Sequence, residues 1–214
     1  MIKIVGLGPG HASYVLPIAL SAIKDADLVI GAKRHLDSVH HLTTKTMDYS
    51  NGFDEIGEVL LNHDIDETIV LVVSGDVGFY SMLDFVKRTV KDQPIELVPG
   101  ISSLQYLYSK LGFGYEESKW VSLHGRNFDL KKSIRSEEEL GILLDRKQNN
   151  QYIAKQYKVV RDEQKDLFNE DRPSPVFYVG ERLSYEDEQI SRLSIDECIH
   201  YRAEDLSVVI VRYE

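Results

Sequence analysis

The sequence predicts an α/β protein of two domains, each with a mainly parallel or mixed sheet, flanking helices and a cleft between the domains. In the first half, short apolar runs alternate with longer amphipathic stretches, which is typical of parallel strands joined by helices. After the glycine-containing stretch 111–119, strand-like runs follow with fewer strong helices. We therefore place the domains at 1–115 and 116–214, sizes typical of compact domains.

The first domain is expected to begin with a strand and then alternate. A helix at 17–26 is supported by Ile18, Ala22 and Ala26, which recur at helical spacing, and Pro17 suits its first turn. The remaining expected elements of this domain are strands at 3–7, 28–30, 68–73 and 95–98, and helices at 81–91 and 103–111.

The second domain is expected to be richer in strands. One helix is expected from about residue 151, within the polar stretch 145–172. The strand-like runs are 120–123, 141–144, 175–179, 188–192 and 207–212.

Composition excludes several classes of protein. A formal net charge of -10 argues against a general affinity for nucleic acid or for an anionic membrane. The single cysteine, Cys198, excludes an internal disulfide and a multi-cysteine metal site, and we predict no metal. No apolar run approaches the roughly 20 residues of a membrane span, and no signal peptide is recognised, so we expect a cytoplasmic protein.

Three glycine-containing loops follow strands of the first domain. They are 6–11 (GLGPGH), 74–81 (SGDVGFYS) and 99–103 (PGISS). Glycine after a strand usually only makes the turn, so each loop alone is weak support for a ligand site. Because the carboxyl ends of parallel strands form one edge, where ligands bind, the three loops together predict a binding site.

The first loop does not suit a dinucleotide. The fingerprint G-x-G-x-x-G requires a third glycine where this chain has His11. Pro9 has no N–H to offer a pyrophosphate and disfavours a helical conformation at Gly8. A dehydrogenase is therefore only a minor alternative.

Several polar residues have both a structural and a functional interpretation. Asp76 is either a turn acid that bonds its own backbone or a carboxylate that faces a ligand, and the two stand about equal. Ser102 and Ser103 precede an apolar helix, so capping is the simpler role. Lys33 and Arg34 are cations that could pair with ligand carboxylates, although surface solvation is the more general role of such residues.

Arg126 is a further candidate for pairing with a carboxylate. It follows the expected strand at 120–123, in the segment LHGR at 123–126, which also contains His124. Solvation at the surface is again the simpler interpretation.

Taken in order, these segments resemble the tetrapyrrole (corrin/porphyrin) methylases. The resemblance runs from VGLGPGH through VSGDVGFYS, ELVPGISSLQYL and LHGR to VGERLSYEDEQI, nearly the whole chain. Within the family, GAKRHL and VGERLSYEDEQI are most similar to the branch that methylates carbon 5 of cobalt-precorrin-7 (precorrin-6Y) in cobalamin biosynthesis. The resemblance implies the two-domain fold of the class III S-adenosylmethionine methyltransferases.

The resemblance also implies roles for particular residues. S-adenosylmethionine would lie folded in the cleft, and the tetrapyrrole beside the first loop. His11 would be the catalytic candidate. The substrate carboxylates would meet Lys33, Arg34, His124 and Arg126. The cofactor would be held by Pro9, Ser74, Gly75, Asp76, Phe79, Ser102, Ser103, Leu144 and Gly180.

Three positions depart from the family pattern. Val77 stands where proline is usual, so the second loop is less rigid than in other members. His11 stands where aspartate is common, and Leu16 where a capping threonine is common.

The resemblance leaves alternatives and implies partners. The alternatives are another methylase of this fold, such as a diphthine synthase or another precorrin methylase, and a ligand-binding module without activity. An RNA methyltransferase of this fold is disfavoured by the acidic chain. We expect a homodimer, and a separate protein for the carbon-15 methylation and decarboxylation.

Overall fold

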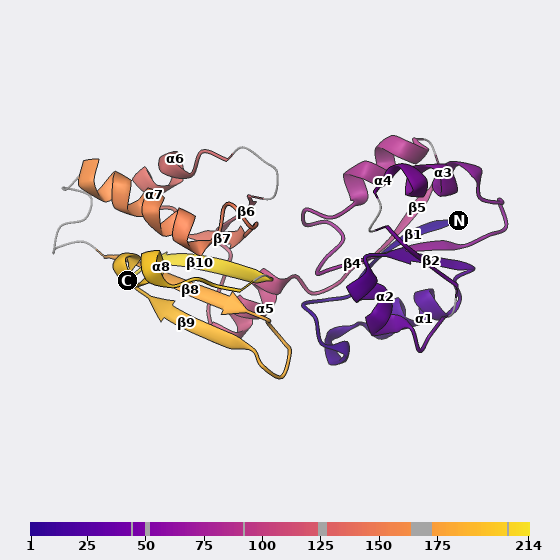
Figure 1. Cartoon of the computed structure of the whole chain (residues 1–214), viewed down its shortest axis with the longest axis horizontal. Helices are drawn as coiled ribbons and strands as arrows, with labels where there is room; N and C mark the ends of the chain where they lie inside the picture. Colours follow the sequence, from indigo (N-terminus) through magenta and orange to yellow (C-terminus); the bar gives the residue numbers. More distant parts are fainter. Residues whose placement is uncertain (44, 50–51, 92, 124–127, 164–172, 205) are drawn as a thin grey trace. The chain divides into compact units, whose positions relative to one another are not determined.

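The computed structural model describes residues 1–43, 45–49, 52–91, 93–123, 128–163, 173–204 and 206–214. The chain divides into two compact units, Met1–Ser103 and Leu104–Glu214 (Figure 1).

The division falls at the start of α5 (Ser103–Leu111), whereas the predicted first domain ends after this helix, at residue 115. The reason lies in the packing of α5. A β-carbon at Gly141 would lie 3.2 Å from Leu104 Cδ1, and one at Gly180 would lie 3.1 Å from Leu107 Cδ1. The helix therefore packs against the sheet of the second unit.

The first unit contains a five-stranded parallel sheet. Its strand order is β3-β2-β4-β1-β5, and every pairing between neighbours is parallel. The strands are β1 (Ile2–Gly6), β2 (Leu28–Gly31), β3 (Thr46–Asp48), β4 (Ile69–Val73) and β5 (Ile95–Val98). The helices are η1 (Ala12–Tyr14), α1 (Pro17–Lys24), α2 (Lys33–Val39), α3 (Asp54–Asn62) and α4 (Leu83–Val90).

Helices cover both faces of this sheet. All five residues of β4 are buried, as expected for a central parallel strand. Ile56 of α3 and Val86 of α4 belong to one hydrophobic cluster. Ile23 of α1 and Leu36 of α2 belong to another. The first unit is therefore a three-layer α/β/α structure (Figure 1).

The second unit contains a five-stranded mixed sheet in the order β6-β7-β10-β8-β9. Only the β6–β7 pairing is parallel. The strands are β6 (Lys119–Ser122), β7 (Leu140–Leu143), β8 (Pro175–Glu181), β9 (Gln189–Leu193) and β10 (Ser207–Tyr213). The helices besides α5 are α6 (Leu130–Arg135), α7 (Asn150–Glu163) and α8 (Ile195–His200).

Side-chain alternation assigns helices to the two faces of the mixed sheet. Leu140 and Ile142 of β7 belong to the cluster that includes Ile134 of α6, Tyr157 of α7 and Ile195 of α8. Gly141, between them, points to the opposite face and α5. The parallel and mixed sheets confirm the predicted α/β class.

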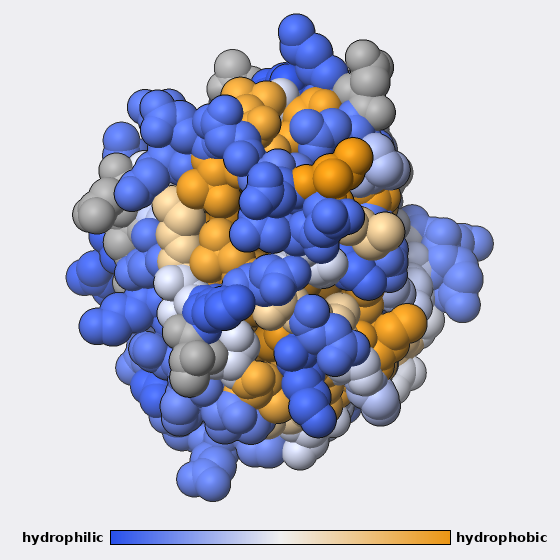
Figure 2. Space-filling view, turned by 90° about the vertical axis from the view of Figure 1, so that its right-hand side faces the viewer, coloured by the Kyte–Doolittle hydropathy of each residue, from blue (hydrophilic) through white to orange (hydrophobic). Residues whose placement is uncertain are grey.

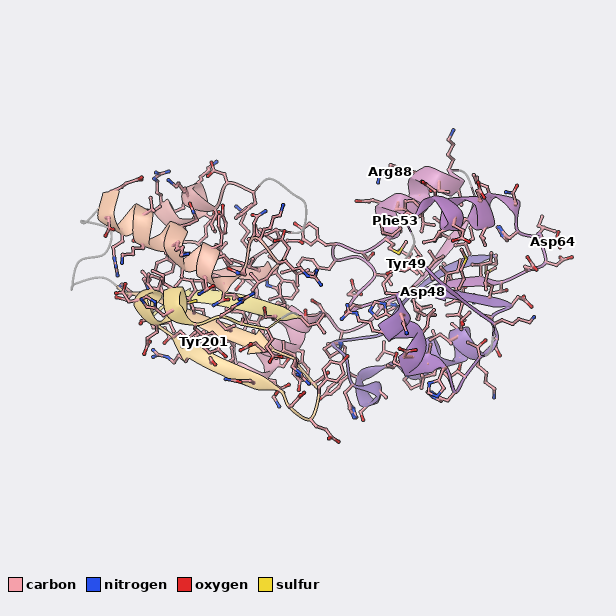
Figure 3. The ribbon with its side chains drawn as sticks, viewed as in Figure 1. Asp48, Tyr49, Phe53, Asp64, Arg88 and Tyr201 are labelled. Carbon is pink, nitrogen blue, oxygen red and sulfur yellow. The ribbon has the colours of Figure 1, made fainter. Side chains whose placement is uncertain are left out.

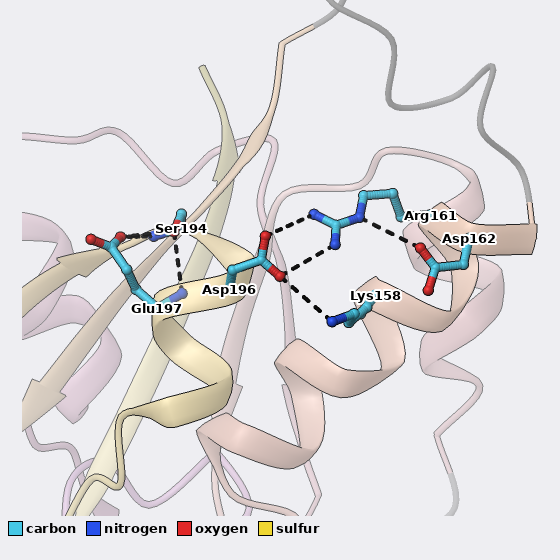
Figure 4. Close-up of polar contacts among 6 residues, drawn as sticks. All are labelled: Lys158, Arg161, Asp162, Ser194, Asp196 and Glu197. Atoms are coloured by element: carbon cyan, nitrogen blue, oxygen red, sulfur yellow. Dashed lines mark hydrogen bonds and ion pairs between the residues drawn. The ribbon is translucent and has the colours of Figure 1, made fainter.

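The starts of α1 and α8 differ in how they are capped. α1 begins at Pro17 without a side-chain cap from Leu16, as the sequence predicts. α8 begins with a capping box, in which Ser194 and Glu197 satisfy each other's backbone N–H groups (Figure 4). Asp196 in the same turn pairs with Arg161 of α7 at 3.3 Å, which ties α8 to α7.

Hydrophilic residues cover much of one face of the molecule (Figure 2). Figure 2 shows a face on which polar and charged residues surround apolar ones. Along the part of the chain that the structure describes, no helix combines the length and the apolar character that crossing a membrane would require.

Candidate active site

Three loops meet at the carboxyl edge of the parallel sheet, through contacts that only glycine permits. β1 lies between β4 and β5, so the loop after β1 is flanked by the loops after those two strands. A β-carbon at Gly6 would lie 2.6 Å from the carbonyl oxygen of Gly75 and 2.8 Å from the backbone nitrogen of Gly100. At Gly100 it would lie 2.2 Å from the same oxygen. Side chains are therefore excluded at this junction.

Backbone hydrogen bonds join the first two loops. Gly8 N–H donates to the Gly75 carbonyl at 3.2 Å, and Gly75 N–H donates to the Gly8 carbonyl at 2.8 Å. Both residues have positive φ, 79° at Gly8 and 68° at Gly75, a conformation that glycine adopts without strain. The glycines thus shape the edge itself, not merely the turns.

The carboxylate of Asp76 joins the second loop to the third. Oδ1 accepts the N–H of Gly78 at 2.8 Å, which is the bond of a turn acid to its own loop. Oδ2 accepts the N–H of Gly100 at 3.2 Å, across the junction. The structural interpretation of Asp76 is therefore correct, and it includes a contact between loops that the sequence does not reveal.

Val77 anchors the second loop in the core. Its side chain is 5% exposed and belongs to the cluster that contains Ile4 and Val86. Ser81 Oγ donates to the Val77 carbonyl and so closes the following turn. Burial of the Val77 side chain thus holds this loop in place.

The residues around the junction differ in accessibility. Ser74 is exposed, Pro9 and Phe79 are half-buried, and Ser102 is buried with 3% exposure. The ring of Phe79 lies edge-on to Tyr80, with 4.8 Å between centroids. Ser103 is half-buried at the first turn of α5.

His11 caps the short helix η1. Its Nδ1 accepts the N–H of Ser13 at 3.2 Å, and its side chain is exposed. A neutral imidazole whose Nδ1 accepts a hydrogen bond carries its proton on Nε2. In this arrangement His11 presents a donor, so removing a proton from a substrate requires the bond to Ser13 to break.

Two cations and a half-buried histidine follow β2 at the same edge. Lys33 and Arg34 are exposed at the start of α2 and form no ion pair with the residues that the structure describes. Next to them, both ring nitrogens of His35 are buried and have no hydrogen-bond partner within the described ranges. Burial, and then the nearby Arg34 charge, lower the pKa of His35 to about 4. His35 is therefore neutral near pH 7.

A pocket of about 710 Å³ lies within the second unit, a volume that suits a small molecule. Two segments line it: the loop after β7, with residues 144–147 and 149, and the approach to β10, with residues 202–204 and 206–207. Lys147 and Arg202 line it without an ion pair to any described residue, whereas Glu204 pairs with Arg182 at 3.2 Å.

The wall of this pocket at 202–204 is held by two buried polar side chains. Asn150 at the start of α7 is fully buried, and its Oδ1 accepts the N–H of Ala203 at 3.3 Å. Glu181 at the end of β8 is 4% exposed, and its Oε1 accepts the N–H of Glu204 at 2.7 Å. Its Oε2 accepts a hydrogen bond from the hydroxyl group of Tyr201, which is labelled in Figure 3.

Comparison with known proteins places the chain in a family. The family model of the tetrapyrrole (corrin/porphyrin) methylases matches residues 1–199. The chain belongs to this family. That assignment confirms the predicted resemblance, and it confirms that the protein is a methyltransferase.

Two relatives resemble this methylase along nearly its whole length. A probable cobalt-precorrin-7 C(5)-methyltransferase of Methanocaldococcus jannaschii is 31% identical over 92% of this chain and 90% of its own. A cobalt-precorrin-7 C(5)-methyltransferase of Salmonella typhimurium is 27% identical over 91% of each chain. A crystal structure of uroporphyrin-III C-methyl transferase from Thermus thermophilus, complexed with S-adenyl homocysteine, shares the fold. Its TM-score is 0.74 at 20% identity, over 99% of this chain and 91% of that one.

The structure brings together some of the predicted site residues of this methylase. Pro9, Ser74, Gly75, Asp76, Phe79, Ser102 and Ser103 all belong to the three loops at the edge of the parallel sheet. In the second unit, Leu144 lines the pocket, whereas Gly180 lies within β8 and is not among the residues that line it. His124 and Arg126 lie outside the described residues.

Sequence reasoning missed the residues that hold the pocket wall. Asn150 is in the buried stripe of α7, at helical spacing with Ile153, Ala154 and Tyr157. A polar residue in an apolar stripe was the available signal. For Glu181 the signal was an acid that ends a run of buried strand residues.

Proposed function

We propose that this methylase transfers a methyl group from S-adenosylmethionine to carbon 5 of cobalt-precorrin-7 in cobalamin biosynthesis. The observation that carries the proposal is the similarity to two C(5)-methyltransferases along more than nine-tenths of the chain. No feature of the described residues favours a second function.

The glycine junction supports binding of S-adenosylmethionine. Because Gly6 and Gly100 have no side chains, the three loops pack directly against one another and present their backbone groups close together at the sheet edge. The polar groups of Ser74 and the loop backbone lie at that edge. The cofactor supplies a methyl group that its sulfonium already activates for transfer.

We assign the predicted residues to the cofactor in two sets. In the first unit Asp76 fixes the relative position of two loops, and its oxygens keep lone pairs for a ligand hydroxyl or amine. In the second unit Leu144 provides an apolar wall of the pocket. The full set is Pro9, Ser74, Gly75, Asp76, Phe79, Ser102, Ser103, Leu144 and Gly180.

Alignment and exclusion of water are the contributions expected from this protein. Correct orientation of reactants can supply roughly 7–11 kcal/mol in favourable cases. The interlocked loops are suited to orientation because each is tied to the next by backbone bonds or by Asp76. We retain His11 as the candidate acceptor for the proton released at carbon 5, in a conformation without the Ser13 bond.

The carboxylates of the tetrapyrrole are assigned to Lys33 and Arg34, and also to His124 and Arg126. The first two are exposed at the sheet edge and have no ion pair within the described part of the chain. Lys33→Ala with Arg34→Ala should raise the KM for the tetrapyrrole more than it lowers kcat. Lys24→Ala, an exposed lysine at the end of α1, is the control. Equal kinetic constants in the double variant would remove both cations from the site.

The proposal includes assembly and location. We propose a homodimer in the cytoplasm, and a separate protein for methylation and decarboxylation at carbon 15. Size-exclusion chromatography with light scattering tests the dimer, and a monomer at micromolar concentration would contradict it.

Two measurements test the function. Titration calorimetry should detect S-adenosylhomocysteine binding, and preferential binding of NAD would overturn the cofactor assignment. Incubation with S-adenosylmethionine and cobalt-precorrin-7 should add the mass of one methyl group to the tetrapyrrole. Cofactor binding without that product would indicate another substrate or a binding module.

A further inference from the structure

The segment from Tyr201 to Glu204 has no regular secondary structure and yet forms part of the pocket wall. It connects α8 to β10, and residues 202–204 line the pocket. A segment without a helix or strand ladder must bond its backbone elsewhere to keep one conformation. Its bonds go to side chains of α7 and β8.

Asn150 bonds this segment at two points. Its Nδ2 donates to the Tyr201 carbonyl at 2.6 Å, and its Oδ1 accepts from Ala203 N–H at 3.3 Å. Nδ2 also lies 3.4 Å from the Cys198 carbonyl, at the last turn of α8. One fully buried amide is thus hydrogen-bonded both to the last turn of α8 and to the segment that follows it.

Glu181, at the end of β8, forms hydrogen bonds to the same segment. Its two oxygens accept the Glu204 N–H and the Tyr201 hydroxyl. Within the described ranges no lysine or arginine pairs with this buried carboxylate, so these two donors replace its hydration. Burying this polar side chain is tolerated because its hydrogen bonds are made, and both of them go to the Tyr201–Glu204 segment.

Tyr201 connects Glu181 to β9. Its hydroxyl oxygen accepts from Gln189 Nε2 at 3.1 Å and from Ser191 Oγ at 3.3 Å. Burial, and then the adjacent Glu181 carboxylate, raise the pKa of Tyr201, so the hydroxyl stays protonated and donates at neutral pH. The wall is therefore bonded to α7, β8 and β9 together.

We propose that Glu181 and Asn150 are positioning residues that fix the Tyr201–Glu204 segment in the shape that binds S-adenosylmethionine. This inference rests on the proposed function, because it assigns the pocket to the cofactor. Neither side chain is among the residues that line the pocket, so both act through the backbone they hold.

Paired variants of Glu181 test the inference. Glu181→Ala removes both acceptors and should leave the segment in its binding shape about a tenth of the time, which weakens S-adenosylhomocysteine binding by about tenfold. The KM for S-adenosylmethionine should rise equally, with kcat at saturation within about twofold of the parent. Glu181→Gln should restore affinity to within about threefold, because its amide oxygen still accepts from Glu204 N–H.

The control is Glu186→Ala, which removes an exposed acid of the same β8–β9 connection that has no described contact. It should leave affinity unchanged. A folded Glu181→Ala with the parent affinity, or one with reduced kcat and unchanged affinity, would overturn the inference. Tyr201→Phe removes only the hydroxyl and tests the same segment should Glu181→Ala fail to fold.

Amide hydrogen exchange separates this inference from the proposed function. In the ligand-free protein, Glu181→Ala should accelerate exchange at Glu204 at least tenfold while the amides of β8 keep their protection. Unchanged exchange at Glu204 would overturn the positioning role. A parent protein that fails to bind S-adenosylhomocysteine would overturn the proposed function, whatever the exchange result.

Discussion

The two units build their candidate binding surfaces by opposite means. In the first unit, the surface is made by the absence of side chains, because Gly6, Gly75 and Gly100 let three loops interlock. In the second unit, it depends on the presence of side chains, because Asn150 and Glu181 hold a segment without regular structure. Adding a side chain at the glycines should therefore disrupt the first surface, and truncating Asn150 or Glu181 should disrupt the second.

Gly100→Ala should have the largest effect and would test the first half of this comparison. Its β-carbon would lie 2.2 Å from the Gly75 carbonyl oxygen, so the loops must separate. We expect a loss of about 3 kcal/mol or more in unfolding free energy, measured with urea. Gly57→Ala, within α3, is the control, and we expect it to change the unfolding free energy in the opposite direction. Its β-carbon would meet only Thr89 Cγ2, at 3.8 Å. It should stabilise the protein by up to about 1 kcal/mol.

Asn150→Ala should cost slightly less, about 3 kcal/mol, and would test the second half. It leaves the Ala203 N–H and the Tyr201 carbonyl without their buried partner. Asn149→Ala is the neighbouring control, because it removes only the bond from Tyr152 N–H to the Asn149 side chain at the helix start. That loss should be about 1 kcal/mol. Equal losses in urea unfolding would show that burial of Asn150 has no special importance.

His35 predicts a dependence of stability on pH in the first unit. Its pKa is about 4 in the folded state against 6.5 as the ordinary value, so between these values the unfolded chain binds more protons. Stability is then complete above about pH 6.5 and falls as the pH decreases toward 4. The loss attributable to His35 is on the order of 3 kcal/mol.

The measurement compares urea unfolding of the parent and of His35→Gln at several pH values. The difference between the two curves should change over this window. His41→Gln replaces an exposed histidine and should parallel the parent. A constant difference for His35→Gln between pH 4 and 7 would contradict the prediction.

Asp76→Asn should have the smallest effect on stability, about 1–2 kcal/mol. The amide keeps an acceptor for Gly78 N–H, but its NH₂ group cannot accept from Gly100 N–H. Calorimetry should also detect weaker S-adenosylhomocysteine binding. Asp66→Asn, at an exposed acid without a described contact, should change neither quantity. Parent-like affinity in Asp76→Asn would limit Asp76 to its structural role.

The parts of the fold that repeat a simple pattern were predictable from the sequence. β5 and α5 have the predicted limits, because apolar periodicity and flanking turn residues define them. Several elements were missed, among them α2, β3, α3, α6 and α8. For α8 the capping-box residues Ser194 and Glu197 were a usable signal.

The two candidate surfaces also differed in how far the sequence could predict them. The glycine loops could be predicted because each follows its own strand and the rule for parallel sheets brings them to one edge. The bonds of Asn150 to Tyr201 and Ala203 span about fifty residues and depend on how α7 and α8 pack. No local pattern reports such a contact.

The central claim is methylation at carbon 5, and the most direct test places the methyl group on the product. The protein is incubated with cobalt-precorrin-7 and S-adenosylmethionine that carries ¹³C in its transferable methyl, and the product is analysed by ¹³C NMR. We predict a single enriched methyl signal, attached to carbon 5. Enrichment at any other carbon, or no enrichment by a protein that binds the cofactor, would contradict the assignment.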